Sequence, residues 1–266
     1  MKLELHLPSD GFYRGTRFDH SGIFRSLEYK GVELCGPWFQ HYDPYLHDAV
    51  QGPAEEFSPI TLDGYWLKTG VGLLKQDGEP YDRFKRYQVA DPGRWEVEGM
   101  RFFHHLDTFY DYEKEIAVTG ENRFEIRHTL HTFVPMKGDV YNHNFFTMGK
   151  MAVTPSRLID FPFSPQGDWR AAYDSVGFTS GGIRFFRALQ EGESVYTGNI
   201  HRAGEEGMPY EMTLREGELS VSVKGDVPVF KTVLWANHRI ACLEPYNRID
   251  LPPGESIRWK IEYTLI

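Results

Sequence analysis

Two short segments place a polar side chain inside apolar, strand-like sequence, where its burial costs free energy unless it is paired or used. In the first, His143 lies between two asparagines and leads into two phenylalanines. In the second, Glu244 ends the apolar run 240–243 and is followed by a proline. A histidine and a glutamate that face one cleft can act as general acid and general base. The competing interpretation is that each is a satisfied structural side chain.

The elements that must position these residues are β-strands. Apolar and polar residues alternate with a period of two most clearly over residues 256–265, the pattern of a strand with one buried face. The same alternation occurs over residues 3–7, 124–130 and 219–223. Glycine-containing turn signals separate such runs, as at residues 62–64 and 215–217. These patterns predict many short strands joined by turns.

The fold class follows from this pattern. No segment keeps apolar residues at i, i+3, i+4 and i+7 over three turns, so we expect few and short helices. Many short strands predict an all-β fold, a large antiparallel β-sandwich, because each sheet buries one face and needs a second sheet against it. The chain has 266 residues, 41% of them hydrophobic and 15% aromatic, which is enough for one large domain over residues 1–266. Residues 155–182, rich in proline and glycine, are expected to form a long irregular loop.

Charge and composition exclude several classes of partner. The chain carries 29 basic and 38 acidic residues, a formal net charge of −9, and so offers no basic surface for nucleic acid or an anionic membrane. No apolar run approaches the ~18 residues of a membrane-spanning helix. We expect a small uncharged polar ligand, no nucleic-acid partner and no membrane partner. The oligomeric state is left open.

Cysteine content and the N-terminus bear on the compartment and on cofactors. The two cysteines, Cys35 and Cys242, are too few for a disulfide framework or a cysteine-rich zinc site, and we expect no cofactor. The first residues alternate polar and apolar types and lack the continuous apolar core of a signal peptide, which favours the cytoplasm. A leader removed before this chain begins is compatible with the same sequence.

The order of several short motifs resembles the aldose 1-epimerase (galactose mutarotase) superfamily. An N-H-x-[YF]-F-like motif that carries a histidine in that family is matched by residues 142–146, and a later C-x-E segment that carries the catalytic glutamate is matched by residues 242–244. An L-x-P-G-E turn into the last strand is matched by residues 251–255. Residues 34–39, with Trp38, and residues 232–235, with Trp235, look like the family's early strand and the strand that leads to the glutamate.

The resemblance covers most of the chain and implies a fold and an activity. The fold is the galactose mutarotase-like supersandwich, a large antiparallel β-sandwich. The activity is that of an aldose 1-epimerase-like isomerase, which interconverts the α and β anomers of a neutral aldose. Glu244 would be the base that takes the proton from the anomeric hydroxyl, and protonated His143 would be the acid that protonates the ring oxygen.

One stretch departs from the family pattern. Where the family has a motif such as H-G-F-A-R, with a second histidine and a substrate-binding arginine, residues 51–57 read Gln-Gly-Pro-Ala-Glu-Glu-Phe. Two carboxylates at this place, Glu55 and Glu56, predict that a sugar phosphate is repelled. Arg17, in a polar group with Arg14 and Asp19, could supply the missing cation. His104 could supply a cleft-facing imidazole.

We expect a neutral sugar to be bound by aromatic stacking and hydrogen bonds. Trp38 and Trp235 could stack on the apolar face of the sugar, with core packing as the alternative for both. Glu55, Glu56 and Asn142 could exchange hydrogen bonds with its hydroxyl groups. A metal site in the loop that holds Asp43, His47 and Asp48 is conceivable, but no spacing makes these ligands converge, so no metal is expected.

Two other functions fit the same residues. A catalytically silent carbohydrate-binding protein would keep the sandwich and the cleft without the acid–base pair, and the altered stretch 51–57 favours it. A sugar lyase would need Glu55, Glu56 and a histidine to converge on one cleft or metal. The fold alone does not choose among these functions.

Overall fold

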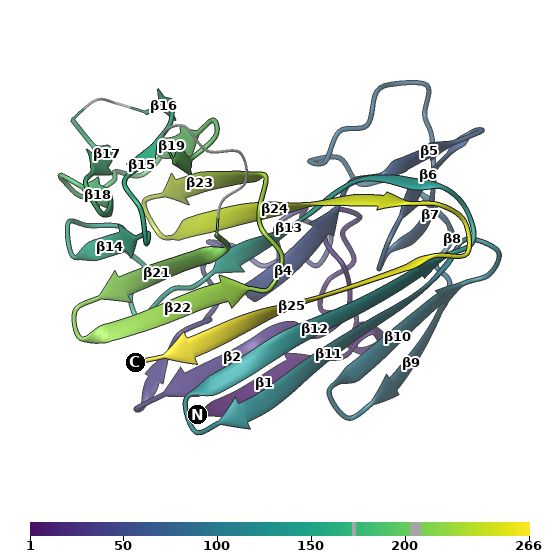
Figure 1. Cartoon of the computed structure of the whole chain (residues 1–266), viewed down its shortest axis with the longest axis horizontal. Coiled ribbons are helices and arrows are strands. Elements are labelled where there is room, and N and C mark those ends of the chain that lie inside the picture. The colour runs from purple at the N-terminus through teal and green to yellow at the C-terminus, as the bar shows by residue number, and fades with distance from the viewer. Residues whose placement is uncertain (172–173, 203–208) are drawn as a thin grey trace.

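The computed structural model describes residues 1–171, 174–202 and 209–266. Within these residues the only helix is the short 3-10 helix η1 (Pro8–Asp10), and every strand pair is antiparallel. Two large sheets lie against each other, and three smaller sheets accompany them (Figure 1). The predicted all-β antiparallel sandwich with few helices is therefore confirmed.

The larger sheet has ten strands and includes the C-terminal strand that the alternating pattern predicted. In spatial order its strands are β17 (Val176–Thr179), β18 (Gly182–Phe185), β14 (Arg157–Asp160), β21 (Glu211–Glu216), β22 (Leu219–Gly225), β25 (Ser256–Leu265), β12 (Arg123–Thr132), β11 (Tyr110–Gly120), β10 (Arg101–Leu106) and β9 (Arg94–Glu98).

The second large sheet has six strands. In spatial order they are β16 (Trp169–Arg170), β19 (Ser194–Thr197), β23 (Lys231–Asn237), β24 (Ala241–Leu251), β13 (Met136–Phe145) and β4 (Gly52–Phe57). β13 and β24 pair with Tyr141 opposite Tyr246. Two residues further along this antiparallel register, His143 comes opposite Glu244, so the two segments singled out by their polar residues lie on neighbouring strands.

Three smaller sheets complete the described fold. They consist of β1 (Lys2–His6), β2 (Ile23–Tyr29) and β3 (Val32–Glu33); of β5 (Ile60–Leu62), β6 (Tyr65–Lys68), β7 (Gly72–Lys75) and β8 (Val89–Asp91); and of β15 (Pro165–Gln166) with β20 (His201–Arg202). The long irregular loop predicted for residues 155–182 is wrong, because strands β14 to β17 lie within it. These strands have only two to four residues each, too few for a period-two pattern to stand out between the prolines and glycines.

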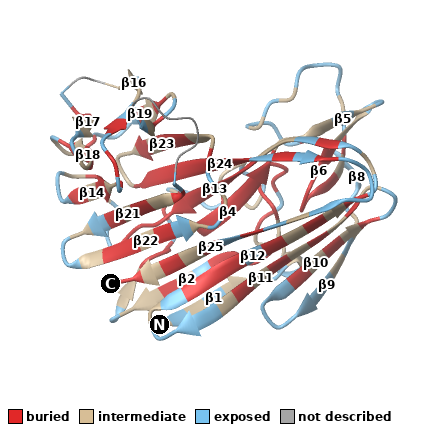
Figure 2. Cartoon of the chain, viewed as in Figure 1, coloured by how far each residue is buried: buried red, intermediate tan, exposed pale blue. Residues whose placement is uncertain are grey.

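The core forms because each long strand buries one face. On β25 the buried positions Trp259, Ile261, Tyr263 and Leu265 alternate with more exposed ones, as the sequence predicted. The ring of Phe57 on β4 packs 6.2 Å from that of Trp259, joining the two large sheets. Figure 2 shows buried residues along β4, β13 and β24. All six residues of β4 are buried, so this strand is covered on both faces.

Three further features complete the description. The turns at Gly64 and Gly217 link β5 to β6 and β21 to β22, with φ of 74° and 61°, values that glycine adopts without steric cost. Cys35 and Cys242 are both free and buried. No helix in the described part of the chain is long and apolar enough to cross a membrane.

Candidate active site

The pocket lies on the outer face of the six-stranded sheet. Successive residues of β13 point alternately to the two faces of this sheet. Tyr141, His143 and Phe145 point to the outer face, whereas Asn142 and Asn144 point into the sandwich. The pocket has a volume of about 170 Å³. Its walls come from three loops and from β13, β19, β23 and β24, and are formed by Arg17, His47, Asp48, Arg83, Phe84, His143, Phe145, Tyr196, Trp235, Glu244 and Tyr246.

His143 and Glu244 meet directly in this pocket. Nε2 of His143 lies 3.2 Å from Oε1 of Glu244, and the Tyr246 hydroxyl donates a 3.3 Å hydrogen bond to Oε2. The two residues are only 3% and 4% exposed. The His143 ring stacks on Phe145 with its centroid 3.8 Å away, which fixes its orientation.

The protonation state of His143 follows from its surroundings. Burial lowers the pKa of His143, and Glu244 opposes this shift only in part. The imidazole is therefore neutral near pH 7. Because Nε2 faces a carboxylate oxygen, it carries the proton, which leaves Nδ1 as an acceptor. No described residue gives this buried Nδ1 a hydrogen bond.

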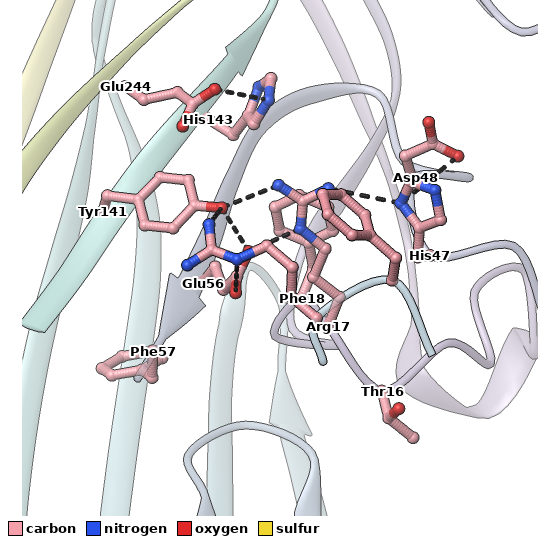
Figure 3. A network of polar contacts seen from close by, with 12 residues as sticks. Thr16, Arg17, Phe18, His47, Asp48, Glu56, Phe57, Tyr141, His143 and Glu244 are labelled. Atoms are coloured by element: carbon pink, nitrogen blue, oxygen red, sulfur yellow. Dashed lines mark hydrogen bonds and ion pairs between the residues drawn. The ribbon is translucent and has the colours of Figure 1, made fainter. Parts of the chain in front are cut away.

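Arg17 organises the polar wall beside this pair (Figure 3). Its Nε donates to Oε2 of Glu56 at 2.6 Å, and its Nη2 donates to the Tyr141 hydroxyl at 2.8 Å. Its Nη1 lies 3.3 Å from Nδ1 of His47, which accepts because arginine can only donate. The Tyr141 hydroxyl also donates to Glu56. The guanidinium is thus fixed in place at the edge of the pocket.

Three cations surround the single carboxylate of Glu56. Besides Arg17, Lys68 Nζ and Arg83 Nε each lie 3.6 Å from Oε1. Burial alone would raise the pKa of Glu56, but Lys68, Arg17 and Arg83 outweigh it and lower this pKa to about 2. Burial lowers the pKa of Lys68 to about 8. The wall is therefore not acidic, and the charge argument against a sugar phosphate loses its basis.

Glu55 and Asn142 do not reach the pocket. Glu55 is adjacent to Glu56 on β4 and so faces the sandwich interior, where it pairs with Lys114 and accepts a 2.8 Å hydrogen bond from Nδ2 of Asn142. The prediction that these two side chains bind substrate does not fit this placement. The convergence of Glu55, Glu56 and a histidine that a sugar lyase would need is also absent, since the two glutamates face opposite sides of the sheet.

His104 and the neighbours of Arg17 also lie elsewhere. His104 is on β10 of the ten-stranded sheet, where Nε2 donates to the Pro92 carbonyl at 2.9 Å and the ring stacks on Trp95. It is a buried structural histidine, so its predicted contact with substrate is wrong. Asp19 faces the interior, with its Oδ2 3.4 Å from Nζ of Lys114. Of the polar group predicted around it, only Arg17 lines the pocket.

The two tryptophans have different positions. Trp235 lines the pocket, its ring 5.8 Å from that of His143 and at a steep angle to it. Trp38 is buried behind the pocket wall: its Nε1 donates to the Val50 carbonyl at 2.9 Å, and its ring stacks on Phe145. Core packing, the alternative considered for both, therefore describes Trp38, while Trp235 can contact a ligand.

Several residues that line the pocket or contact its lining residues had no predicted role in catalysis or binding. Tyr141 could have been found, because it stands two positions before His143 on the same strand face. Arg83 and Phe84 come from the loop after β7, which carries no recognisable motif; Nη1 of Arg83 donates to the Tyr141 hydroxyl at 3.0 Å, and Phe84 is 62% exposed. His47 and Asp48, considered only as metal ligands, also line the pocket. In residues 1–171, 174–202 and 209–266, no three His, Cys, Asp or Glu side chains form a group that could hold a metal.

Comparison with known proteins supports the fold. No protein-family model and no curated protein matches the sequence. A galactose mutarotase related enzyme from Lactobacillus acidophilus matches the structure with a TM-score of 0.54 at 12% identity, over 96% of this chain and 96% of its own. A galactose mutarotase-like protein from Clostridium acetobutylicum matches with a TM-score of 0.53 at 13% identity, over 100% of this chain and 98% of its own. The chain has a galactose mutarotase-like fold.

The order of the sequence motifs predicted this fold. At sequence identities of 12% and 13%, the similarity to these proteins concerns the fold alone. Within this sandwich, a carboxylate and an imidazole meet in a pocket with aromatic walls and a fixed guanidinium. Such a pair can accept a proton from one ligand oxygen and donate a proton to a neighbouring one.

Proposed function

We propose that the pocket interconverts the α and β anomers of an aldose by acid–base ring opening. The observation that carries this proposal is the 3.2 Å pairing of His143 and Glu244 inside one pocket. The anomeric hydroxyl and the ring oxygen are bonded to the same carbon, so the base and the acid must lie side by side. Neighbouring strands β13 and β24 supply that arrangement.

The reaction uses only groups of this chain. A carboxylate oxygen of Glu244 takes the proton from the anomeric hydroxyl while protonated His143 gives its proton to the ring oxygen. The bond between the anomeric carbon and the ring oxygen breaks, which leaves an open-chain aldehyde. After rotation of the aldehyde, the same steps run in reverse and close the ring on the other face. A sugar bound over the pair replaces their mutual contact with contacts to these two oxygens.

Substrate binding is assigned to the pocket walls. Trp235, Tyr246 and Phe84 offer aromatic faces on which the apolar face of a sugar can stack. Arg17 and Arg83 offer hydrogen-bond donors to hydroxyl groups. With both cations at the wall, the charge of the pocket does not decide between a neutral aldose and an anionic one. A neutral aldose remains our proposal because the chain as a whole is acidic.

The test is NMR exchange between anomers across a panel of free aldoses and aldose phosphates. Glu244→Gln and His143→Asn should each lower the enzymatic rate by roughly 10²- to 10⁴-fold. The double variant should lose little more, because the two groups act in one step. Glu113→Gln and His131→Asn make the same two substitutions on the ten-stranded sheet, away from the pocket. They serve as matched controls and should keep the enzymatic rate.

A catalytically silent carbohydrate-binding protein is the second candidate. The observation that favours it is that both carboxylate oxygens of Glu244 already have partners, in His143 and Tyr246. Well-folded protein that binds sugars in calorimetry but accelerates no anomer exchange would establish this candidate. Exchange that is unchanged in Glu244→Gln would place the reaction elsewhere and overturn the proposal.

A further inference from the structure

A second, wider depression adjoins the pocket. It has a volume of about 660 Å³ and shares two lining residues, Asp48 and Trp235, with the pocket. We infer that this groove binds further sugar units, so that the substrate is the reducing end of a neutral oligosaccharide. The inference rests on the proposed function for its chemistry and adds the substrate class.

The two volumes suit different parts of such a ligand. The pocket, at about 170 Å³, lies below the ~300–1,000 Å³ of sites for drug-sized molecules and suits a single sugar ring. The ring that undergoes mutarotation carries the free anomeric carbon, so it must sit against His143 and Glu244. Any further units of an oligosaccharide extend from its other hydroxyls. The groove beyond Trp235 adjoins the pocket through the shared lining residues Asp48 and Trp235, and such units could enter it.

The groove has the mixed chemistry that sugars require. Its aromatic side is formed by Phe39 and Trp235, whose ring centroids lie 6.1 Å and 5.7 Å from that of the buried Trp38. Its polar side includes Gln40, which is exposed and donates a 2.8 Å hydrogen bond to Glu191. An apolar face next to exposed donors and acceptors matches a sugar ring, which has both.

The charges of the groove disfavour an anionic chain. Among the described residues, Asp48, Glu191 and Glu193 line it together with one guanidinium, that of Arg239. Glu193 also pairs with Arg187 at 2.7 Å, so these five charged groups leave a net charge of −1. Arg239 donates from Nε to Nε2 of His238 at 3.1 Å and keeps its positive charge. A chain of uronic acids or sulfated sugars would meet net repulsion there. The groove therefore fits neutral hexose units.

The test compares maltose, cellobiose, lactose and maltotriose with their monosaccharides. We expect at least one oligosaccharide to have a kcat/KM for anomer exchange about tenfold above that of its reducing-end monosaccharide. In Phe39→Ala and Gln40→Ala this ratio should fall toward one. Phe133→Ala, which removes an exposed phenylalanine between β12 and β13, is the matched control and should keep the ratio. Saturation-transfer NMR with Glu244→Gln should show contact between the protein and the non-reducing unit.

The outcomes separate this inference from the proposed function. If monosaccharides exchange fast and no oligosaccharide exchanges faster, or if the groove variants leave the ratio unchanged, the groove is not a subsite and the proposed function stands. If nothing is accelerated but the oligosaccharides still bind more tightly than monosaccharides and lose that advantage in Phe39→Ala, the mutarotase proposal fails and the groove inference stands.

Discussion

At the scale of single residues, the chemistry depends on His143 being a poor base and therefore, once protonated, a strong acid. Burial among Phe145, Trp235 and Phe18 disfavours the charged imidazolium, while Glu244 partly compensates. A protonated imidazole held beside a carboxylate transfers its proton readily to a ring oxygen. The cost is that only a minor fraction of His143 is protonated near pH 7.

This state of His143 predicts the pH dependence of the reaction. The pKa of His143 in the free enzyme is below 6.5, so the protonated fraction falls as the pH rises above that value. We expect kcat/KM to decrease between pH 6.5 and 8.5 by up to about tenfold per pH unit. The measurement is anomer exchange after subtraction of the spontaneous rate at each pH. A kcat/KM that is flat over this range would show that His143 does not act as the acid.

The residue scale also shows why the sequence could predict only part of the site. His143 and Glu244 stood out because each is a polar residue in an apolar strand. Glu55 and Glu56 are chemically identical neighbours, and which of them lies on the pocket side of the sheet, against Arg17, depends on strand register that the sequence does not contain. Arg83 stands in a loop with no periodic pattern at all, so no local signal could have placed it at the site.

At the scale of elements, His104 ties together the edge of the ten-stranded sheet. Its Nε2 donates to Pro92, just before β9, and its Nδ1 lies 2.9 Å from the hydroxyl of Tyr110 at the start of β11. Both contacts suit the neutral imidazole. Burial lowers the pKa of His104 to about 4, from 6.5 for an unperturbed histidine.

These values predict that the edge strands weaken in acid. In the unfolded chain His104 binds a proton below pH 6.5, whereas in the folded chain it does so only near pH 4. The contribution of neutral His104 to the free energy of unfolding is therefore complete above pH 6.5 and is lost as the pH falls toward 4. At pH 5 the loss should be about 2 kcal/mol for this one group. Urea unfolding at pH 7.5 and pH 5 measures it. His104→Gln should reduce the difference between the two pH values by that amount, whereas His131→Gln, on β12 two strands away, should not.

The elements differ in how well the sequence predicted them. Long strands with one buried face, such as β12 and β25, carry ten residues of alternation each and were recognisable. The short strands β14 to β17 are too brief to show a period and owe their conformation to pairing with distant strands, as β14 does with β21. Tertiary contacts decide such segments, so the loop prediction there failed.

At the scale of the whole molecule, a buried ionic cluster joins the two large sheets. Glu55 of β4 pairs with Lys114 of β11, and Lys114 also lies 3.4 Å from Asp19. His128 of β12 adds a contact of 3.7 Å to Glu55. Burial raises the pKa of Asp19 to about 6, and Glu55 adds to the shift, while Lys114 limits it. Two buried carboxylates thus share one ammonium group as their main counter-charge.

The stability of the sandwich should therefore depend on Lys114. Lys114→Met keeps the volume but leaves Glu55 and Asp19 without their ammonium partner, which should lower the free energy of unfolding by about 3–5 kcal/mol. Lys137→Met removes a lysine whose pair with Asp250 is exposed and should change it by less than about 1 kcal/mol. Urea unfolding at pH 7.5 provides both values. Adding Glu55→Gln to Lys114→Met removes one of the unpaired buried carboxylates and should restore part of the lost free energy of unfolding. If Lys114→Met instead has the same free energy of unfolding as the Lys137→Met control, the cluster does not hold the two sheets together.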